Sequence, residues 1–431
     1  MRKLLALVLL PAAFAAGCGG GGSSSNSGGG GGGGGGGTQT IATPGPPNVE
    51  SVSVDAGPAV LQTLNPPITS VNTAFISVKV CVPGSTTNCQ TIDHVEIDTG
   101  SVGLRILADA PLSVTLPAVV DSGGAPLAEC LAFADGFSWG SVNTADIVLP
   151  VSGESASSVT VQVIAQSPTG IGAPQAACVP PANSPLPEEN TVATFGANGI
   201  LGVGPFINDC NSEGACAPGS SATYYSCSSS GNCTSLTASL AQQVVNPVTL
   251  FATDNNGVII ELPAVGTGGA QTVTAGAVVF GIGTENNNAL GDASQIPADP
   301  ASGFITANLN GSTYTDSYLD SGSNGNFLTD SRLMPICPTP SNANPTSGFY
   351  CPSSTVSESA TLGAGAVAAN FDVANADNLF ASNFSAYNNL GGTNPDPASL
   401  DLGLSFFFGR NVFTGFETTT GASPYFAYID N

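Results

Sequence analysis

The stretch Val95-Glu96-Ile97-Asp98-Thr99-Gly100-Ser101-Val102-Gly103 recurs in altered form 222 residues later, as Ser317-Tyr318-Leu319-Asp320-Ser321-Gly322-Ser323-Asn324-Gly325. Both copies have an apolar residue, then Asp, Thr or Ser, Gly, Ser, any residue and Gly. One such motif is common, because Asp-Ser-Gly is an ordinary turn. Two copies half a chain apart predict two related lobes that each bring one carboxylate to a shared site.

A pair of carboxyls has a chemistry that a single one lacks. Two carboxyls about 3 Å apart cannot both ionise, so they share one proton and titrate as a unit. The ionised one acts as general base on water, and the protonated one donates to a carbonyl oxygen. Asp98 and Asp320 are therefore the candidate catalytic residues, against the alternative of two aspartates that merely cap turns. The residues predicted to support this dyad are Thr99, Gly100, Ser101, Ser321, Gly322 and Ser323.

The remaining sequence favours an all-β protein. The chain has 431 residues, which suits two lobes or one large β architecture. Alternating apolar stretches punctuated by Gly, Asn and Pro recur, for example at residues 75–80, 159–163 and 258–262. We expect one lobe over residues 49–245 and a second over 246–431, with a cleft between them.

The N-terminus predicts export and a lipid anchor. Basic residues 2 and 3 precede an apolar run, and small residues then lead directly to Cys18, which is typical of a lipoprotein signal peptide over residues 1–17. A plain secretory signal with an incidental Cys is the alternative. Residues 18–48 are rich in Gly, Ser and Pro and predict a flexible tether. Gly19 follows the cysteine where an Asp would favour retention, so we expect the outer membrane.

Ten cysteines remain after residue 18, an even number that implies disulfides in an exported protein. Spacing predicts four local pairs, and the two remaining cysteines pair by elimination. The predicted pairs are Cys81–Cys89, Cys210–Cys216, Cys227–Cys233, Cys337–Cys351 and Cys130–Cys178. Metal binding is the alternative for Cys-rich loops, but the chain has no Cys-x-x-Cys and only one histidine, His94. We expect no metal and no cofactor.

The excess of acidic over basic residues limits which molecules the protein is expected to bind. Beyond the signal the basic residues are Lys79, Arg105, Arg332 and Arg410, against thirty acids. No basic patch can be built, so nucleic acid is not an expected partner. We expect Arg105 to be solvated or paired, Arg410 to pair with a nearby acid, and His94 to be a satisfied strand residue. The protein is expected to be a monomer.

Each Asp motif is followed by an apolar stretch that ends in Gly. The first is residues 195–204, with Gly202 lying 104 residues after Asp98, and the second is residues 402–411, with Gly409 lying 89 residues after Asp320. This order resembles that of pepsin-type aspartic peptidases: two active-site loops, each with a later closing strand, here Asn198-Gly199-Ile200-Leu201-Gly202 and Phe407-Phe408-Gly409-Arg410-Asn411. Residues 277–283 resemble an early strand of the second lobe. The layout also resembles an uncharacterised bacterial family of exported proteins.

The resemblance implies an all-β, bilobal pepsin-like (acid protease) β-barrel architecture with a cleft between the lobes. It also implies a β-hairpin flap over the site, matched here by residues 133–140, which lack the family's Tyr. The candidates to cover the site are Phe133, Phe137 and Trp139, the last with its indole N–H. The alternative for Trp139 is an ordinary core or surface aromatic. The implied function is an aspartic-type endopeptidase acting on peptide or protein substrates. The alternative is a catalytically inactive lipoprotein of this fold that acts as a surface or periplasmic binding protein.

Overall fold

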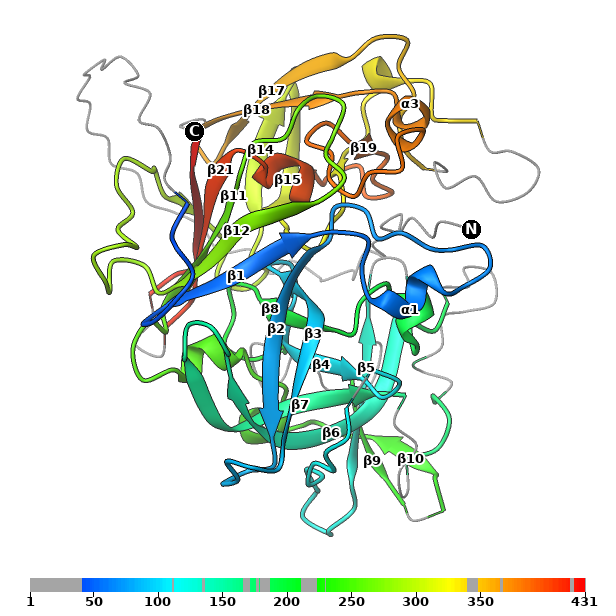
Figure 1. Ribbon diagram of the computed structural model, residues 1–431, viewed down its shortest axis with the longest axis vertical. Coiled ribbons are helices and arrows are strands. Elements are labelled where there is room, and N and C mark those ends of the chain that lie inside the picture. The colour runs from blue at the N-terminus through cyan, green and yellow to red at the C-terminus, as the bar shows by residue number, and fades with distance from the viewer. Residues whose placement is uncertain are drawn as a thin grey trace, which may run out of the picture.

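The structure is a computed structural model that describes residues 41–110, 112–133, 136–165, 171–175, 178, 187–210, 223–228, 230–338, 348–364, 367–418 and 422–430. Strands dominate these residues, and the helices are single turns (Figure 1). The helical elements are α1 (Ala59–Gln62), α2 (Val192–Phe195), α3 (Ala376–Phe380), α4 (Leu404–Phe407) and the 3-10 turns η1 (Leu240–Gln242), η2 (Pro247–Leu250) and η3 (Ser331–Leu333). Within the described part of the chain, every helix is too short or too polar to cross a bilayer.

The first half of the chain folds into a closed barrel. Its strands are β1 (Val49–Val54), β2 (Ala74–Cys81), β3 (Cys89–Asp98), β4 (Val102–Leu107), β5 (Leu127–Ala132), β6 (Phe137–Val148), β7 (Ser155–Ile164), β8 (Gly199–Val203), β9 (Tyr224–Cys227) and β10 (Cys233–Ser235). The order β6-β7-β4-β8-β3-β2 is closed into a ring by a further pairing of β2 with β6. Closure removes exposed sheet edges and buries the alternating Val, Ile and Leu side chains inside.

The second half contributes strands to two sheets. They are β11 (Gly257–Leu262), β12 (Val273–Phe280), β13 (Ile296–Pro297), β14 (Ile305–Leu309), β15 (Ser312–Leu319), β16 (Asn326–Phe327), β17 (Val356–Leu362), β18 (Val367–Val373), β19 (Gly391–Gly392), β20 (Asp401–Leu402), β21 (Arg410–Gly415) and β22 (Tyr425–Asp430). Seven of them form a separate sheet in the order β18-β17-β14-β15-β20-β16-β19. The others extend the sheet of the first half.

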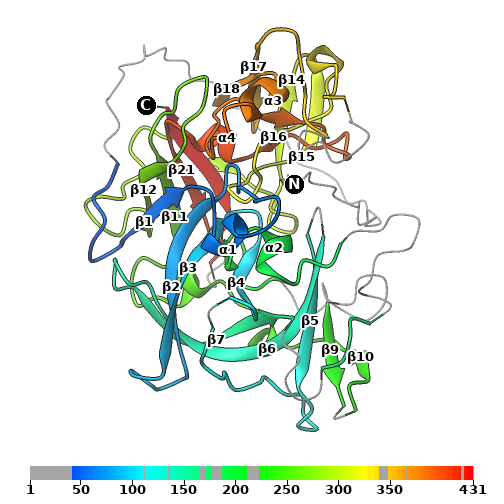
Figure 2. The ribbon, with the colours of Figure 1, turned by 45° about the vertical axis from the view of Figure 1, so that its right-hand side comes forward.

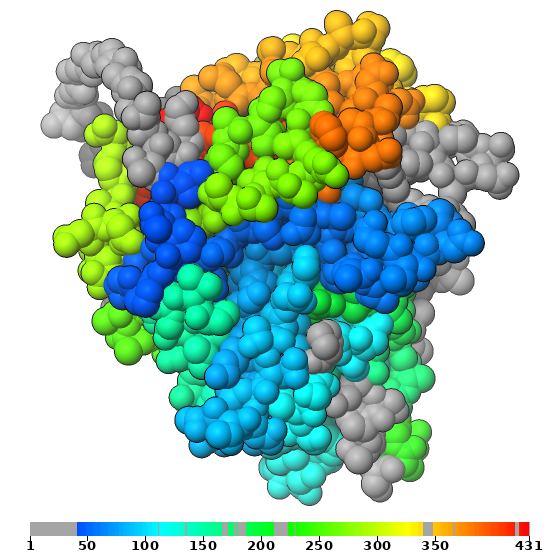
Figure 3. Space-filling model, in the orientation of Figure 1, coloured from blue at the N-terminus to red at the C-terminus, as the bar shows by residue number. Residues whose placement is uncertain are grey.

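The two halves are joined by β1. It pairs with β12 from Val49↔Val279 onward and with β2 at Ser53 and Val54, so one sheet runs from the first half into the second. In Figure 3 the dark-blue start of the described chain packs across the face between the cyan and teal first half and the orange second half. Figure 2 shows α1 beside α2 in front of the barrel, where the two helices contact each other. The all-β, bilobal architecture predicted from the sequence is confirmed.

The local topology around each motif is duplicated. In the first half β3 runs parallel to β8, with Ile97 opposite Leu201, and β8 pairs antiparallel with β4. In the second half β15 runs parallel to β20, with Leu319 opposite Leu402, and β20 pairs antiparallel with β16. The closing strand of the second half is therefore β20, which leads into Gly403.

This finding corrects the sequence prediction of a closing strand that ends at Gly409. The Phe406-Phe407-Phe408 run looks like a buried strand, but residues 404–407 form α4 and Gly409 precedes β21. The physical reason is close packing at Gly403, where an added Cβ would lie 2.1 Å from the Gly325 oxygen and 2.5 Å from the Ser323 oxygen. Only glycine admits that approach, as at Gly202, where a Cβ would lie 2.5 Å from the Val102 nitrogen.

Four of the predicted disulfides are present. They are Cys81–Cys89, Cys130–Cys178, Cys227–Cys233 and Cys337–Cys351. Cys216 lies outside the described residues, and so do Cys18, the predicted signal and residues 18–40 of the predicted tether. Residues 41–48 of that tether are instead part of the fold, where Gly45 bridges to Val49 and Asn48 is fully buried. The bond between Cys130 and Cys178 closes the longest of the four loops, with a sequence separation of 48, and attaches β5 to residue 178.

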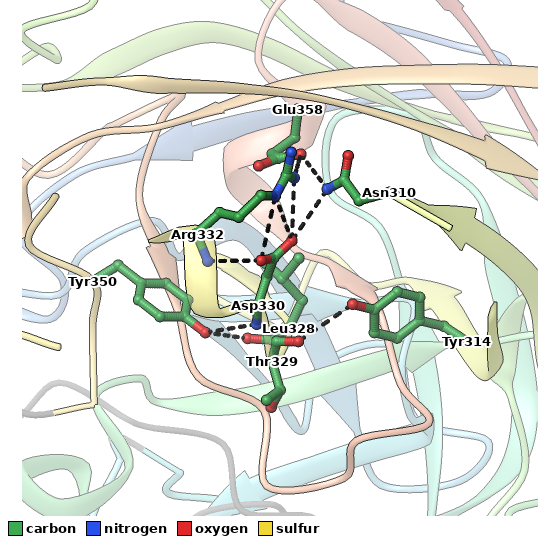
Figure 4. Close-up of polar contacts among 8 residues, drawn as sticks. All are labelled: Asn310, Tyr314, Leu328, Thr329, Asp330, Arg332, Tyr350 and Glu358. Atoms are coloured by element: carbon green, nitrogen blue, oxygen red, sulfur yellow. Dashed lines mark hydrogen bonds and ion pairs between the residues drawn. The ribbon is translucent and has the colours of Figure 1, made fainter. Parts of the chain in front are cut away.

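A polar network in the second half connects η3 and the residues after β16 with β15 and β17 (Figure 4). Asp330 accepts from the Arg332 guanidinium and from the Asn310 amide at 3.1 Å, and Arg332 also pairs with Glu358 on β17. Tyr350 donates to the Leu328 carbonyl at 2.7 Å. Because Leu328 directly follows β16, the network fixes the strand that leaves the second motif.

Candidate active site

The two motif aspartates lie at the ends of equivalent strands. Asp98 is the last residue of β3, and Asp320 directly follows β15. Both are largely buried, with exposed fractions of 5% and 6%. In each half the short closing strand pairs beside the carboxylate-bearing turn, so the turn has one fixed conformation.

Each carboxylate is held by its own loop in the same way. The Gly100 N–H donates to Asp98 Oδ1 at 2.6 Å, and the Ser101 hydroxyl donates to Asp98 Oδ2. In the second loop the Gly322 N–H donates to Asp320 Oδ1 at 2.8 Å, and the Ser323 hydroxyl donates to Asp320 Oδ2 at 2.8 Å. These bonds fix both carboxyl planes before any substrate binds.

The residues after the aspartates cross between the loops. Thr99 Oγ1 donates to the Leu319 carbonyl at 3.0 Å and accepts from the Ser321 N–H at 2.9 Å. Ser321 Oγ donates to the Ile97 carbonyl at 2.7 Å and accepts from the Thr99 N–H at 3.1 Å. All four bonds are buried, so they fix one loop against the other with a near two-fold symmetry.

The crossing brings the two carboxyls together. A Cβ added at Gly100 would lie 2.6 Å from Asp320 Cγ, and one added at Gly322 would lie 2.5 Å from Asp98 Oδ1. Glycine is needed at both positions because each carboxyl rests directly on the opposite loop's backbone. Burial, and after it the charge of Asp98, raises the pKa of Asp320 well above its ordinary value. The structure therefore brings both predicted aspartates and all six predicted supporting residues into one site.

The dyad opens on a cleft of about 420 Å³. Its lining comes from both halves, including Phe195 and Ile200 from the first and Phe304, Tyr318 and Phe327 from the second. Apolar walls around a few converging polar groups are typical of a ligand site.

The predicted flap is a hairpin of β5 and β6, with Ala132 opposite Phe137. Phe133 follows β5, lines the cleft and packs edge to face on Phe195 at 5.6 Å between ring centroids. Among the three predicted covering residues, Phe133 is the one that lines the cleft.

Phe137 and Trp139 lie away from the cleft, which corrects the covering role predicted for them; for Trp139 the structure shows the alternative, a core aromatic. Both are buried in a separate apolar cluster that includes Cys130 and Cys178. The Trp139 indole N–H donates to the Gly172 carbonyl at 2.8 Å, and the ring packs edge to face on Tyr225. The single N–H of the indole is therefore used in this hydrogen bond and does not reach the cleft.

A buried ion network forms one wall of the cleft. The Arg105 side chain is 0% exposed and donates to Glu129 Oε1 at 2.6 Å and to Asp209 Oδ2 at 3.3 Å. Tyr224 also donates to Asp209 Oδ2, at 2.7 Å. Burial, and then the neighbouring Glu129, raise the pKa of Asp209 well above its ordinary value. Of the two expectations for Arg105, solvated or paired, the structure shows the paired one.

The other charged residues singled out in the sequence have structural partners. Arg410 donates to Asp430 Oδ1 at 2.6 Å, as predicted. His94 pairs with Asp55 at 3.3 Å and packs edge to face on Phe75. Among the described residues, one group of potential metal ligands lies close together, namely Cys337, Cys351 and Asp377. Its two cysteines are bonded to each other and offer no thiolate.

Sequence reasoning missed Asp401, a carboxyl in the closing strand β20. It is fully buried, and it lies close enough to Asp320 to raise the pKa of that carboxyl. The signal was present in Leu400-Asp401-Leu402-Gly403, where an acid interrupts an apolar stretch that leads to a glycine.

The sequence profile of one protein family, described as "Protein of unknown function (DUF3443)", matches residues 45–428. No curated protein matches the chain. Among solved structures the chain is similar to an aspartic proteinase from Irpex lacteus, at 15% sequence identity and a TM-score of 0.46, over 87% of this chain and 97% of that one.

Proposed function

The chain belongs to the DUF3443 family, whose description assigns no function, and we propose that it is an aspartic-type endopeptidase in which Asp98 and Asp320 act together on water. One observation carries the proposal. The two buried carboxyls rest against each other's loops, and each is fixed by its own glycine N–H and serine hydroxyl. Two buried acids so close together share a proton, which is the state that hydrolysis of an amide by this route requires.

The raised pKa of Asp320 assigns the shared proton to it before reaction. The Asp98 carboxylate takes a proton from water as the water oxygen attacks the scissile carbonyl carbon, and Asp320 gives its proton to the carbonyl oxygen. In the collapse that follows, the C–N bond breaks and the amine nitrogen takes the proton from Asp98. A hydroxyl proton of the tetrahedral intermediate returns to Asp320, which restores the dyad.

The cleft suits an extended peptide. Its aromatic and aliphatic lining favours apolar side chains beside the scissile bond, and Phe133 in the hairpin covers the chain from one side. An extended strand also offers N–H and C=O groups to a hairpin edge. These features support a peptide or protein substrate.

The test is cleavage of an unfolded protein from about pH 3 to pH 7, with and without a hydroxyl-bearing inhibitor that mimics the tetrahedral intermediate. Asp98→Asn and Asp320→Asn are each expected to reduce kcat by at least about 10³-fold, and the double variant to be scarcely worse, because the dyad acts as one unit. Asp292→Asn is the matched control, since Asp292 is exposed and does not line the cleft.

A wild-type protein that cleaves nothing across this range would refute the proposal and favour the binding-protein alternative. So would a folded Asp98→Asn protein that cleaves at the wild-type rate.

We further propose that the protein is exported and anchored to the outer membrane by acylation of Cys18. The support is the sequence pattern alone: a charged start, an apolar run, and small residues directly before a cysteine. The Gly-rich stretch up to residue 40 then connects the lipid to the folded part as a tether. Fractionation of cells that express the wild type and Cys18→Ala tests this, because the variant is expected to leave the membrane fraction. A fully membrane-bound Cys18→Ala protein would contradict it.

A further inference from the structure

The second lobe holds a third buried carboxyl close to the dyad. Asp401 lies opposite Tyr318 in the parallel pairing of β15 with β20 and opposite Phe327 in the antiparallel pairing with β16. The equivalent position in the first lobe is Ile200, which lies opposite Glu96 in the pairing of β3 with β8. An acid therefore occupies the place where the duplicated element has an apolar residue.

Asp401 has nothing to balance a negative charge. It is 0% exposed, and neither carboxyl oxygen makes a hydrogen bond within the described residues. The three described arginines are engaged with other acids (Arg105 with Glu129 and Asp209, Arg332 with Asp330 and Glu358, Arg410 with Asp430). An isolated buried carboxylate is so unfavourable that the group takes up a proton. Asp401 is therefore a neutral acid with an O–H to donate.

Ser323 is the group placed to receive that proton. Its loop is tied to the end of β20, because the Leu404 N–H donates to the Ser323 carbonyl at 2.6 Å and a Cβ at Gly403 would lie 2.9 Å from Ser323 Cβ. The Ser323 hydroxyl gives its own hydrogen to Asp320 Oδ2 at 2.8 Å, which leaves its lone pairs to accept. The same hydroxyl is close enough to Asp401 to act against the rise in pKa that burial causes, although no hydrogen bond joins the two side chains in this structure.

We propose that Asp401 is a positioning residue of the dyad, whose carboxyl donates to Ser323 Oγ while Ser323 donates to Asp320, so that the three groups form one proton relay. The inference rests on the proposed peptidase function. In the relay the Asp401 O–H bond breaks as Ser323 Oγ takes the Asp401 proton. At the same time the original O–H bond of Ser323 breaks, and Asp320 takes the hydrogen that Ser323 had carried. The negative charge moves from Asp320 to Asp401, and no atom is gained or lost.

The charged and titratable groups that act on this relay are all acidic or phenolic. Asp98 faces it from the end of β3, and Asp320 and Tyr318 face it from β15. Burial, then the charge of Asp98 and then the neighbouring Asp401 carboxyl raise the pKa of Asp320, and burial raises the pKa of Asp401 in the same direction. The three carboxyls of Asp98, Asp320 and Asp401 therefore keep two protons over a pH range in which a dyad alone keeps one. When one of the two is lost, the dyad draws on the other through Ser323 and stays in its working state.

Two variants separate the hydrogen bond that Asp401 donates from the titrating proton that it holds. Asp401→Leu removes the donor and is expected to lower kcat at least about tenfold with KM within about twofold, because Ser323 loses its orientation on Asp320. Asp401→Asn keeps an N–H donor, so it is expected to recover most of this loss at acid pH. Because Asn holds no titrating proton, the high-pH limb of its kcat profile is expected to move to lower pH by about one unit. A Leu variant with wild-type kcat, or an Asn variant with an unmoved high-pH limb, would overturn the relay.

A measurement without substrate distinguishes failure of the relay from failure of the peptidase. Carboxyl carbons of aspartate labelled with carbon-13 are titrated by NMR in the wild type and in Asp401→Asn, with unfolding curves to verify folding. The wild-type site is expected to hold one proton more than the variant near neutral pH. Equal proton counts refute the relay, whereas an extra proton in a wild type that cleaves nothing refutes the peptidase alone.

Discussion

At the scale of single residues, Arg105 shows how much this site depends on charge balance. It is the cation of a fully buried network and also contacts the Val102 carbonyl at 2.6 Å, one residue after the first motif's serine. Glu129 and Asp209 are both buried around it. Its removal leaves two acids without a cation inside the protein, and this is more unfavourable than the loss of a surface ion pair.

We predict that Arg105→Met destabilises the protein by about 3–5 kcal/mol at pH 7. The loss is expected to be smaller near pH 4, because burial and the neighbouring Glu129 raise the pKa of Asp209, which can then be protonated. Urea unfolding at both pH values measures this. Lys79→Met is the matched control, because it removes the same charge from a half-exposed strand position and is expected to cost about 0.5 kcal/mol or less. Equal losses for the two variants would contradict the buried-network argument.

At the scale of secondary-structure elements, the sequence predicted the two Asp loops but not everything that packs on them. The duplicated motif was enough to predict both loops, because each loop needs a carboxylate, a hydroxyl and two glycines at fixed spacing. The second closing strand was misplaced because three consecutive phenylalanines suit a buried strand and a buried helical turn equally, and apolar pattern alone does not separate them. Asp401 was missed for a related reason, since its role comes from pairing with β15 and β16, which no local pattern encodes.

The flap hairpin shows the same limit. The resemblance to pepsin-type peptidases implied a hairpin here, but which aromatic side chain faces the cleft depends on the strand register, which pairs Cys130 with Trp139. We predict that Phe133→Ala lowers kcat/KM by about tenfold, because one cleft wall and the contact with Phe195 are lost. Val151→Ala, at an exposed hydrophobic residue remote from the cleft lining, is the control. Steady-state kinetics on one peptide measures both, and an unchanged kcat/KM for Phe133→Ala would exclude a flap role.

The disulfide behind this hairpin is predicted to matter more than a short-loop one. Cys130–Cys178 closes a loop with a separation of 48 residues, and Cys227–Cys233 one with a separation of 6. Chain entropy gives about 4 kcal/mol for the first and about 2 kcal/mol for the second. Paired Cys→Ala variants at each site, compared by urea unfolding, test the order. A larger loss for the short loop would show that effects in the folded state outweigh the entropy of the unfolded chain.

At the scale of the whole molecule, the two halves meet through buried acids, and this determines how stability responds to pH. Glu154 in the first half faces Asp254 in the second, and burial followed by that acid raises the pKa of Glu154 to about 7. Burial also raises the pKa of Glu261 to about 7, where its carboxylate accepts from the Ala42 N–H at 2.6 Å. Both carboxyls hold protons more tightly in the folded state than in the unfolded state. The stability they provide is therefore complete below about pH 4.5 and is lost as the pH rises to about 7.

Other groups set the acid side of this window. Burial would raise the pKa of Asp55, but the hydrogen bonds from His94 and from the Gly57 N–H outweigh it and lower the pKa below the usual 3.8. Backbone N–H groups of Ser302 and Ala301 likewise lower the pKa of Asp299. Stability from these two carboxylates is present above about pH 4 and is lost as the pH falls further.

We therefore predict that the melting temperature is highest between about pH 4 and pH 5.5 and falls steadily towards pH 8. The formal net charge of −24 at pH 7 acts in the same direction, because protonation of surface acids relieves repulsion across the whole protein. Calorimetric scans at several pH values measure the profile. Glu154→Gln combined with Glu261→Gln is expected to flatten the fall between pH 5 and pH 7, whereas Glu188→Gln, at a half-exposed position, is expected to leave the slope as it is. A melting temperature that rises from pH 5 to pH 8 in the wild type would contradict this prediction. It would show that Glu154 and Glu261 are ionised in the folded protein and that their charges are balanced by other groups.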